Sequence, residues 1–325
     1  MTSPTPDASA VAARVLDAVE TAVVGKRESL ELVLAGILAG GHVLLEDLPG
    51  LGKTLAARSL AQALGLPFTR AQFTPDLLPA DLIGAEVFDQ RTSEFSFRPG
   101  PVFTGLLLAD EINRTPPKTQ SALLEAMQEH QVTVEGTTRP LPRPFHVLAT
   151  ANPVEHEGTY PLPEAQLDRF LLRLSFGYPS AEEEWDVLGR RLARGTEDQR
   201  VEQVIDADQL LAVQAVVESV HVSDDVGRYA VSLVGATRAH PHALVGASPR
   251  GSLALVVCAR ALAVIRGRDY VIPEDVKDLA HAALDHRVIV RPELWLQEIT
   301  SASIIDAALE GTAVPAAHAR DVAHG

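Results

Sequence analysis

Cysteine is almost absent from this chain, since Cys258 is the only one in 325 residues. One thiol can form neither an internal disulfide nor a thiolate cluster that holds a metal ion. Basic residues are also scarce, with 28 Lys and Arg against 43 Asp and Glu and a formal net charge of −15. Proteins that bind nucleic acid mainly through its phosphate backbone usually carry the opposite charge. The composition therefore excludes a disulfide framework and a thiolate metal centre, and it disfavours nucleic-acid binding.

Long apolar runs are absent as well. The longest apolar stretch, residues 32–45, is interrupted by Gly40, Gly41 and His42 and is too short to span a bilayer. The first ten residues contain neither a basic region nor the apolar core of a secretory signal. We therefore expect a cytoplasmic protein without direct membrane insertion.

The composition that is present, with 46% hydrophobic and 22% charged residues, is that of an ordinary folded protein. Its length corresponds to about two domains. Three short apolar bursts, at residues 42–46, 105–109 and 145–150, each run into polar residues and are separated by segments of helical periodicity. Fully apolar strands of this kind are typical of a parallel α/β sheet that is covered on both faces and binds ligands at its carboxyl edge.

The second part of the chain is predicted to be almost wholly helical from about residue 180. Apolar residues at helical spacing predict five helices, over residues 181–192, 208–217, 226–239, 248–265 and 273–284. We therefore divide the chain into an N-terminal extension with a helix (1–20), an α/β core (20–177), a smaller all-helical domain (178–312) and an Ala-rich tail (313–325).

The first apolar burst runs into Asp-Leu-Pro-Gly-Leu-Gly-Lys-Thr, which begins at Asp47. This segment matches the phosphate-binding loop G-x-x-x-x-G-K-[ST] except that Asp47 replaces the first glycine, a position that contributes turn geometry rather than a ligand. Gly50 and Gly52 would let backbone N–H groups approach the phosphates, with the dipole of the following helix behind them. Lys53 would reach the β and γ oxygens, and the Thr54 hydroxyl would ligate Mg²⁺. The loop therefore predicts a bound nucleoside triphosphate with Mg²⁺.

Asp110 and Glu111 follow the second apolar burst. Alone, an acidic pair at the end of a strand is a common solvated feature, but beside a phosphate-binding loop it has a specific meaning. Asp110 would hold Mg²⁺, directly or through water, and Glu111 would orient and deprotonate an attacking water. The pair therefore predicts hydrolysis of the nucleotide rather than transfer of its phosphate to a second substrate.

Together these motifs resemble those of the MoxR family of AAA+ ATPases, in the clade that carries an insertion in its second helix. The similarity runs from about residue 23 to residue 291. The matching segments are residues 24–26, 45–54, 72–81, 109–120, 149–153 and 167–170. The resemblance implies an α/β AAA+ nucleotide-binding core followed by a helical lid, with ATP and Mg²⁺ bound between them.

The resemblance also implies roles for four residues. Asn152 corresponds to sensor 1, which polarises the attacking water beside Glu111, although a polar residue at a strand end is usually only a cap. Arg169 corresponds to the arginine finger that enters the neighbouring subunit's nucleotide site, and Arg173 is a rival for that role. Arg250 corresponds to sensor 2, and its place in the first turn of a predicted helix agrees. The implied catalytic residues are therefore Glu111, Asn152, Arg169 and Arg250.

The nucleotide would lie with its adenine near Val24 and Gly25 and its phosphates on the loop. The binding residues implied in this way are Val24, Gly25, Pro49, Gly50, Leu51, Gly52, Lys53, Thr54 and Leu55, with Thr54 and Asp110 as the Mg²⁺ ligands. A finger that acts in trans requires neighbours, and the family implies a ring, which we expect to be a hexamer. In the family, ATP turnover remodels partner proteins, often von Willebrand factor A-type domain proteins.

Two further segments resemble elements that line the central pore of related motors. Residues 81–101 match the strand-bearing insertion, and residues 131–144 match a hairpin that precedes sensor 1. Alternation at Val132 and Val134 supports the hairpin independently. Its few charges, which include Arg139 and Arg143, do not form a grip for nucleic acid.

Three functional classes stay open at this point. The first and favoured class is an ATP-driven chaperone that acts on proteins. The second is a nucleic-acid motor, because related helicases share the inserted segments, but the net charge of −15 disfavours it. The third is a nucleotide-gated binding module that hydrolyses slowly or not at all, which the presence of Glu111 and Asn152 disfavours.

Overall fold

The centre of the computed structural model, which describes residues 7–91, 93–154, 159–196 and 199–315, is a five-stranded parallel sheet. The strand order is β2-β5-β8-β1-β9, with every neighbouring pair parallel. The strands are β1 (Val43–Glu46), β2 (Phe68–Gln72), β5 (Leu106–Asp110), β8 (His146–Ala151) and β9 (Leu172–Leu174). The predicted parallel α/β sheet is therefore confirmed, and its three central strands are the three apolar bursts.

The two edge strands lack the signal that marks the central ones. β2 exposes part of its length and carries polar residues such as Arg70 and Gln72, and β9 has only three residues. An edge strand has a neighbour on one side only, so it needs no continuous apolar run. The sequence therefore predicted the interior of the sheet and not its borders.

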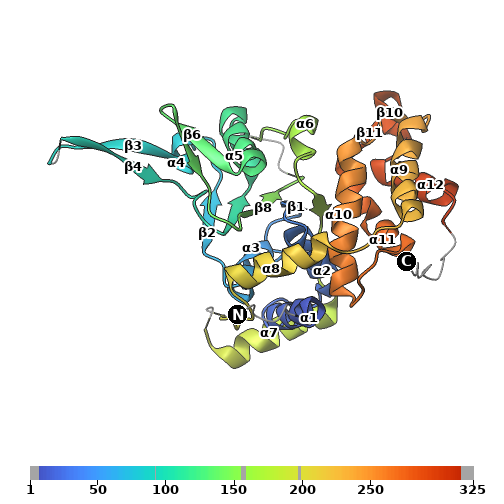
Figure 1. The fold of residues 1–325 in the computed structure, drawn as a ribbon, viewed down its shortest axis with the longest axis horizontal. Helices are drawn as coiled ribbons and strands as arrows, with labels where there is room; N and C mark the ends of the chain where they lie inside the picture. The colour runs from blue at the N-terminus through green and yellow to red at the C-terminus, as the bar shows by residue number, and fades with distance from the viewer. Residues whose placement is uncertain (1–6, 92, 155–158, 197–198, 316–325) are drawn as a thin grey trace, which may run out of the picture.

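Helices cover both faces of the sheet (Figure 1). Along β5, Leu106 and Leu108 pack into one hydrophobic cluster with α1, α2 and α3, whereas Leu107 and Ala109 pack into a second cluster with α5. This alternation follows from the pleat of a strand that is buried on both faces. The helices of this part are α1 (Ala8–Glu20), α2 (Arg27–Leu38), α3 (Lys53–Ala63), α4 (Pro79–Ile83), α5 (Pro117–Glu129) and α6 (Glu164–Leu167).

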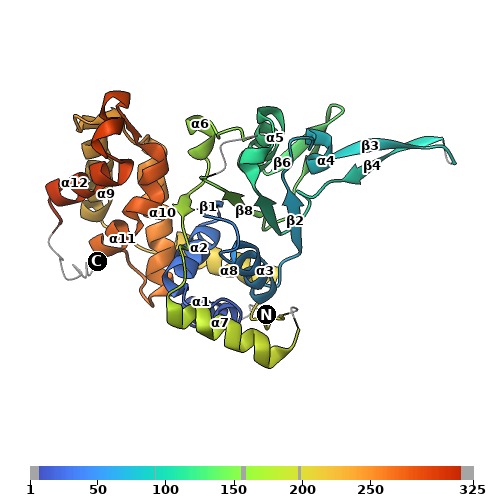
Figure 2. The ribbon, with the colours of Figure 1, turned by 180° about the vertical axis from the view of Figure 1, so that it is seen from behind.

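Two antiparallel hairpins lie within the two segments, residues 81–101 and 131–144, that resemble pore-lining elements of related motors. β3 (Gly84–Asp89) pairs with β4 (Glu94–Pro99), and β6 (Gln131–Val134) pairs with β7 (Thr137–Pro140). The hairpin of β3 and β4 projects far from the core (Figures 1 and 2). Arg139 of β7 forms an ion pair with Glu86 of β3 at 2.5 Å and lies 4.0 Å above the centre of the Phe97 ring of β4. The two hairpins are therefore joined by side chains.

The five helices predicted after residue 180 are confirmed. They are α7 (Ala181–Arg194), α8 (Ala207–Glu218), α9 (Asp224–Ala239), α10 (Pro249–Ile265) and α11 (Pro273–Leu284). The sequence did not predict α12 (Ser301–Gly311) or the short antiparallel pair β10 (Ala243–Val245) and β11 (Ile289–Val290), which is too short to show alternation.

These helices have two different surroundings. α7 and α8 lie against the α/β core, where Arg190 of α7 donates to the Glu20 carbonyl at 2.9 Å and Gln214 of α8 donates to the Ile37 carbonyl at 2.8 Å. α9 to α12 form a bundle whose helix α10 packs against α2 and α1 (Figure 2). The division of the chain near residue 178 stays a prediction. Within the described part of the chain, no helix combines the length and the apolarity that crossing a bilayer requires.

Candidate functional site

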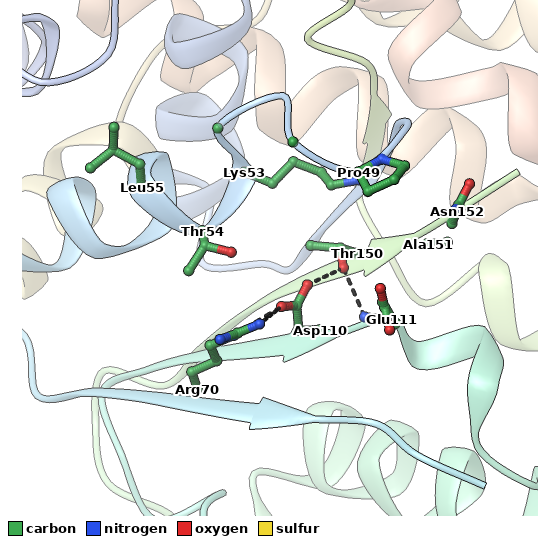
Figure 3. Close-up of a pocket in the computed structure, with 12 residues that line it drawn as sticks. Pro49, Lys53, Thr54, Leu55, Arg70, Asp110, Glu111, Thr150, Ala151 and Asn152 are labelled. Carbon is green, nitrogen blue, oxygen red and sulfur yellow. Dashed lines mark hydrogen bonds and ion pairs between the residues drawn. The ribbon is translucent and has the colours of Figure 1, made fainter. Parts of the chain in front are cut away.

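A polar cavity of about 390 Å³ opens at the carboxyl ends of β5 and β8, beside the start of α3 (Figure 3). It is lined by residues of the phosphate-binding loop and of the ends of three strands, namely Pro49, Gly50, Gly52, Lys53, Thr54, Leu55, Arg70, Asp110, Glu111, Thr150, Ala151 and Asn152. Most of the residues predicted to bind phosphate and Mg²⁺, and two of the four predicted catalytic residues, therefore lie around one space.

The loop leaves its backbone open toward this space. Gly50 and Gly52 adopt φ angles of +86° and +83°, a region that favours glycine. A Cβ atom built on either residue would meet no atom within 4 Å, so neither glycine is required by crowding within the chain. α3 begins at Lys53 directly after the loop, and its first N–H groups have no partner inside the helix. This arrangement suits an anion.

Lys53 extends over the loop rather than into solvent (Figure 3). Its Nζ donates to the backbone carbonyls of Asp47 at 2.5 Å and Leu48 at 3.2 Å. Burial lowers the pKa of Lys53 from its ordinary value, and the carboxylates of Asp47, Asp110 and Glu111 act in the opposite direction. The loop therefore holds a cation at the edge of the cavity.

Asp110 is fixed by two side chains that the sequence analysis did not single out (Figure 3). Thr150 donates its hydroxyl to Asp110 Oδ1 at 2.6 Å and accepts the Glu111 backbone N–H at 2.8 Å. Arg70 donates to Asp110 Oδ2 through Nε at 2.9 Å and Nη2 at 2.6 Å. Both partners come from other strands, Thr150 from β8 and Arg70 from β2. Only the strand order, and no local motif, reveals them.

Glu111 stands in a backbone conformation that non-glycine residues rarely adopt, with φ of +58°. Such strain persists where the surroundings fix it, and it is common at functional sites. The Glu111 carboxylate accepts from Gln72 Nε2 at 2.7 Å and from Arg114 at 3.2 Å. A strained backbone and two donors therefore set the direction of this carboxylate.

Asn152 lies beside Glu111 on the cavity wall (Figure 3). Its Oδ1 accepts the Val154 N–H at 3.1 Å, and its carbonyl accepts from Asn113 Nδ2 at 3.1 Å. Asn152 therefore makes the local contacts expected of a cap and also faces the cavity. Its role as sensor 1 stays a prediction.

Asp47 does more than shape the turn. It is buried, with 4% of its surface exposed, and it accepts from the Ser175 hydroxyl at 2.6 Å, the Phe176 N–H at 2.6 Å and the Gly177 N–H at 3.2 Å. The interpretation that this position contributes only geometry was therefore incomplete. The carboxylate ties the phosphate-binding loop to the chain that follows β9.

Three predicted binding residues do not line the cavity, among the residues that the structure describes. Leu51 lies between the two glycines of the loop without facing the cavity. Val24 and Gly25 lie between α1 and α2, beside the start of α7. A Cβ atom on Gly25 would collide with the Glu183 side chain of α7. An adenine contact at these two residues stays a prediction.

The three arginines considered for catalysis also lie outside the cavity. Arg169 lines a second hollow of about 570 Å³ with α5 residues that include Glu125 and Glu129. Arg173 pairs with Glu46 at 3.2 Å. Arg250 is exposed in the first turn of α10, as its sequence position predicted. The chain therefore does not bring Arg169 or Arg250 to its own loop.

Residues 42–172 match the ATPase family associated with various cellular activities (AAA), and residues 235–308 match the AAA lid domain. The uncharacterized protein YeaC of Bacillus subtilis is 49% identical over 93% of this chain and 94% of its own length. Chaperone MoxR1 of Mycobacterium tuberculosis is 44% identical over 94% of this chain and 83% of its own. The crystal structure of a candidate ATPase from Cytophaga hutchinsonii matches with a TM-score of 0.88 and 42% identity over 95% of this chain and 97% of that chain. The chain belongs to the MoxR family of AAA+ ATPases.

Proposed function

We propose that this protein hydrolyses ATP with Mg²⁺ and uses the reaction to remodel partner proteins. The observation that carries the proposal is the convergence of Lys53, Thr54, Asp110, Glu111 and Asn152 on one cavity. These side chains supply a cation for phosphates, oxygen ligands for a metal, a base and a polar amide. Their combination is what hydrolysis of a nucleoside triphosphate requires.

The donor set fits Mg²⁺. This ion prefers oxygen ligands and is usually bound through one or two carboxylates together with substrate phosphates. Thr54 and Asp110 offer a hydroxyl and a carboxylate on the same cavity, and cysteine and histidine are not among the residues that line it. When bound, Mg²⁺ would neutralise charge on the phosphate oxygens.

Three side chains of the cavity would have different roles in hydrolysis. Lys53, held over the loop carbonyls, would exchange those contacts for the phosphates of ATP. Glu111 would take the proton of the attacking water, and Gln72 and Arg114 would keep its carboxylate directed toward that water. Asn152 would orient the same water.

A complete site would require a second copy of the chain. Arg169 lies outside the cavity of its own chain, and as a finger that enters from a neighbour it would supply the charge that the developing γ-phosphoryl oxygens need. Arg250 would instead reach the nucleotide from the lid of the same chain. This arrangement supports a ring, for which we propose the hexamer. Arg173 is the weaker candidate for the finger, because it already pairs with Glu46.

The proposed substrates of remodelling are proteins, in cytoplasm, with von Willebrand factor A-type domain proteins as the first candidates. The name of the relative Chaperone MoxR1 points in the same direction. The hairpin arginine considered for DNA contact, Arg139, is engaged by Glu86 and by the Phe97 ring, which weighs against a nucleic-acid grip.

ATP turnover with each class of partner tests the proposal. Phosphate release would be measured with the protein alone, with single-stranded DNA, with duplex DNA and with candidate von Willebrand-type proteins, using Lys53→Ala as the inactive control. We expect Mg²⁺-dependent hydrolysis that a protein partner changes and DNA does not. Several-fold stimulation by DNA would favour the motor instead.

A further inference from the structure

Arg70 is a cavity residue to which the proposed reaction gives no role. It lies on the edge strand β2, and 49% of its side chain is exposed. The strand register places Arg70 opposite Leu108 of β5 and the next polar residue of β2, Gln72, opposite Asp110. Arg70 and Asp110 therefore come from neighbouring strands and meet at the carboxyl edge of the sheet (Figure 3).

The contact between them uses the planar fork of the guanidinium. Nε and Nη2 both donate to the same oxygen of Asp110, Oδ2, at 2.9 Å and 2.6 Å. Nη2 also donates to Gln72 Oε1 at 2.8 Å. The other oxygen of Asp110 accepts from Thr150. Both oxygens of the carboxylate thus have donors from the chain itself, and one of these donors is a cation.

A divalent cation needs the same carboxylate. Mg²⁺ requires oxygen ligands in near-ideal octahedral geometry, and a guanidinium on Oδ2 both occupies one side of the ligand and repels a second positive charge. The Asp110 side chain is 10% exposed, so solvent screens this repulsion only weakly. Arg70 is half-exposed, so its guanidinium can leave toward solvent without movement of the strand.

We propose that Arg70 is a positioning residue that competes with Mg²⁺ for Asp110, so that binding of Mg²⁺ and nucleotide requires displacement of its guanidinium. The inference rests on the proposed ATP site. Arg70 neutralises the buried acid before the metal arrives and thereby sets the Mg²⁺ concentration at which the site fills.

The test follows Mg²⁺ binding without turnover. Binding of a fluorescent ATP analogue would be titrated with Mg²⁺, starting from EDTA, in wild type and in Arg70→Gln. We expect the Mg²⁺ midpoint of Arg70→Gln to be about three- to five-fold lower, as suits the loss of one partly exposed ion pair. Mg²⁺ with the analogue should also raise the melting temperature of this variant more than that of wild type. Arg58→Gln, which removes an exposed charge from α3, is the matched control and should keep the wild-type midpoint.

Arg70→Lys is a second variant that keeps the charge and loses the fork, and its midpoint should fall between the other two. If Arg70→Gln does not fold, the Mg²⁺ midpoint of Arg70→Lys alone tests the inference. An unchanged midpoint in both variants overturns the inference, and a higher midpoint shows that Arg70 supports the metal site. Absence of Mg²⁺-dependent nucleotide binding in wild type would instead overturn the proposed function itself.

Discussion

The nucleotide cavity and the hollow that contains Arg169 differ in how many of their polar side chains have hydrogen-bond partners within the described part of the chain. The first brings Lys53, Asp110 and Glu111 together, and each makes hydrogen bonds within the chain. The second, between α5 and α6, holds Arg169, whose buried Nε has no hydrogen-bond partner among the described residues. A buried donor without a partner costs free energy, so it calls for an explanation. The difference is consistent with the proposal that Arg169 acts at the nucleotide site of a neighbouring chain.

The largest expected effect is a loss of ATP hydrolysis, without a loss of ATP binding, when Arg169 of the second hollow is replaced. If Arg169 acts on a neighbour, Arg169→Ala should bind ATP normally and hydrolyse it about 10³- to 10⁵-fold more slowly. Mixing this variant with Lys53→Ala should restore activity, because some interfaces then combine an intact loop with an intact finger. The measurement is phosphate release at increasing protein concentration, with light scattering to show co-assembly. If co-assembled rings of the two variants stay inactive, Arg169 acts within its own subunit or only structurally. Arg173 is then the next candidate for the finger.

The second prediction separates nucleotide binding from ATP hydrolysis at the first hollow, the nucleotide cavity. Glu111→Gln keeps the shape of the side chain and loses the base, so hydrolysis should fall about 10²- to 10⁴-fold while nucleotide binding stays. Lys53→Ala removes the cation for the phosphates and should lose binding. Fluorescent-nucleotide titration and phosphate release distinguish the two variants. Unimpaired turnover by Glu111→Gln would require a different base.

The third prediction concerns the junction beside the second hollow. Asp168 precedes Arg169 and accepts from Arg287 at 2.7 Å and from Ser248 at 3.1 Å. The Arg287 side chain is 2% exposed, so Asp168→Asn should cost about 3 kcal/mol of unfolding free energy by leaving a buried charge underpaired. Asp89→Asn, which removes an exposed partner of Arg91, is the control and should change little. Equal stability in a urea titration would show that Arg287 finds sufficient partners in backbone carbonyls.

The smallest effect arises at His42 and His146, at the amino ends of β1 and β8. Burial lowers the pKa of His42 to about 3 and of His146 to about 4. The unfolded chain takes up these protons below about pH 6.5 whereas the folded chain does not, so stability falls as the pH falls. The loss should be about 1.4 kcal/mol for each histidine between pH 7.5 and 5.5. Urea titrations at both pH values test this, and His146→Gln should show a smaller drop.

Sequence patterns predicted those parts of the site that one continuous segment encodes. The loop from Asp47 to Thr54 and the pair Asp110-Glu111 are local motifs, and the apolar bursts before them are central strands. The contacts of Arg70 with Asp110 and of Asp47 with residues 175–177 join segments 40 and about 130 positions apart. Such contacts depend on which strands become neighbours, and the edge strands β2 and β9 carry little apolar signal. Long-range partners therefore had to come from the structure.

The link between the two hairpins has a mechanical consequence. Arg139 of β7 contacts both β3 and β4. A force applied to the long hairpin of β3 and β4 is therefore also transmitted to the short hairpin of β6 and β7. The short hairpin is continuous with α5 on one side and leads through residues 141–145 into β8 on the other. β8 is the central strand of the sheet, with Thr150 near its carboxyl end and Asn152 directly after it. A force at the tip of the projecting hairpin thus has a path to the wall of the nucleotide cavity, first through the contacts of Arg139 and then along the chain from β7 to β8.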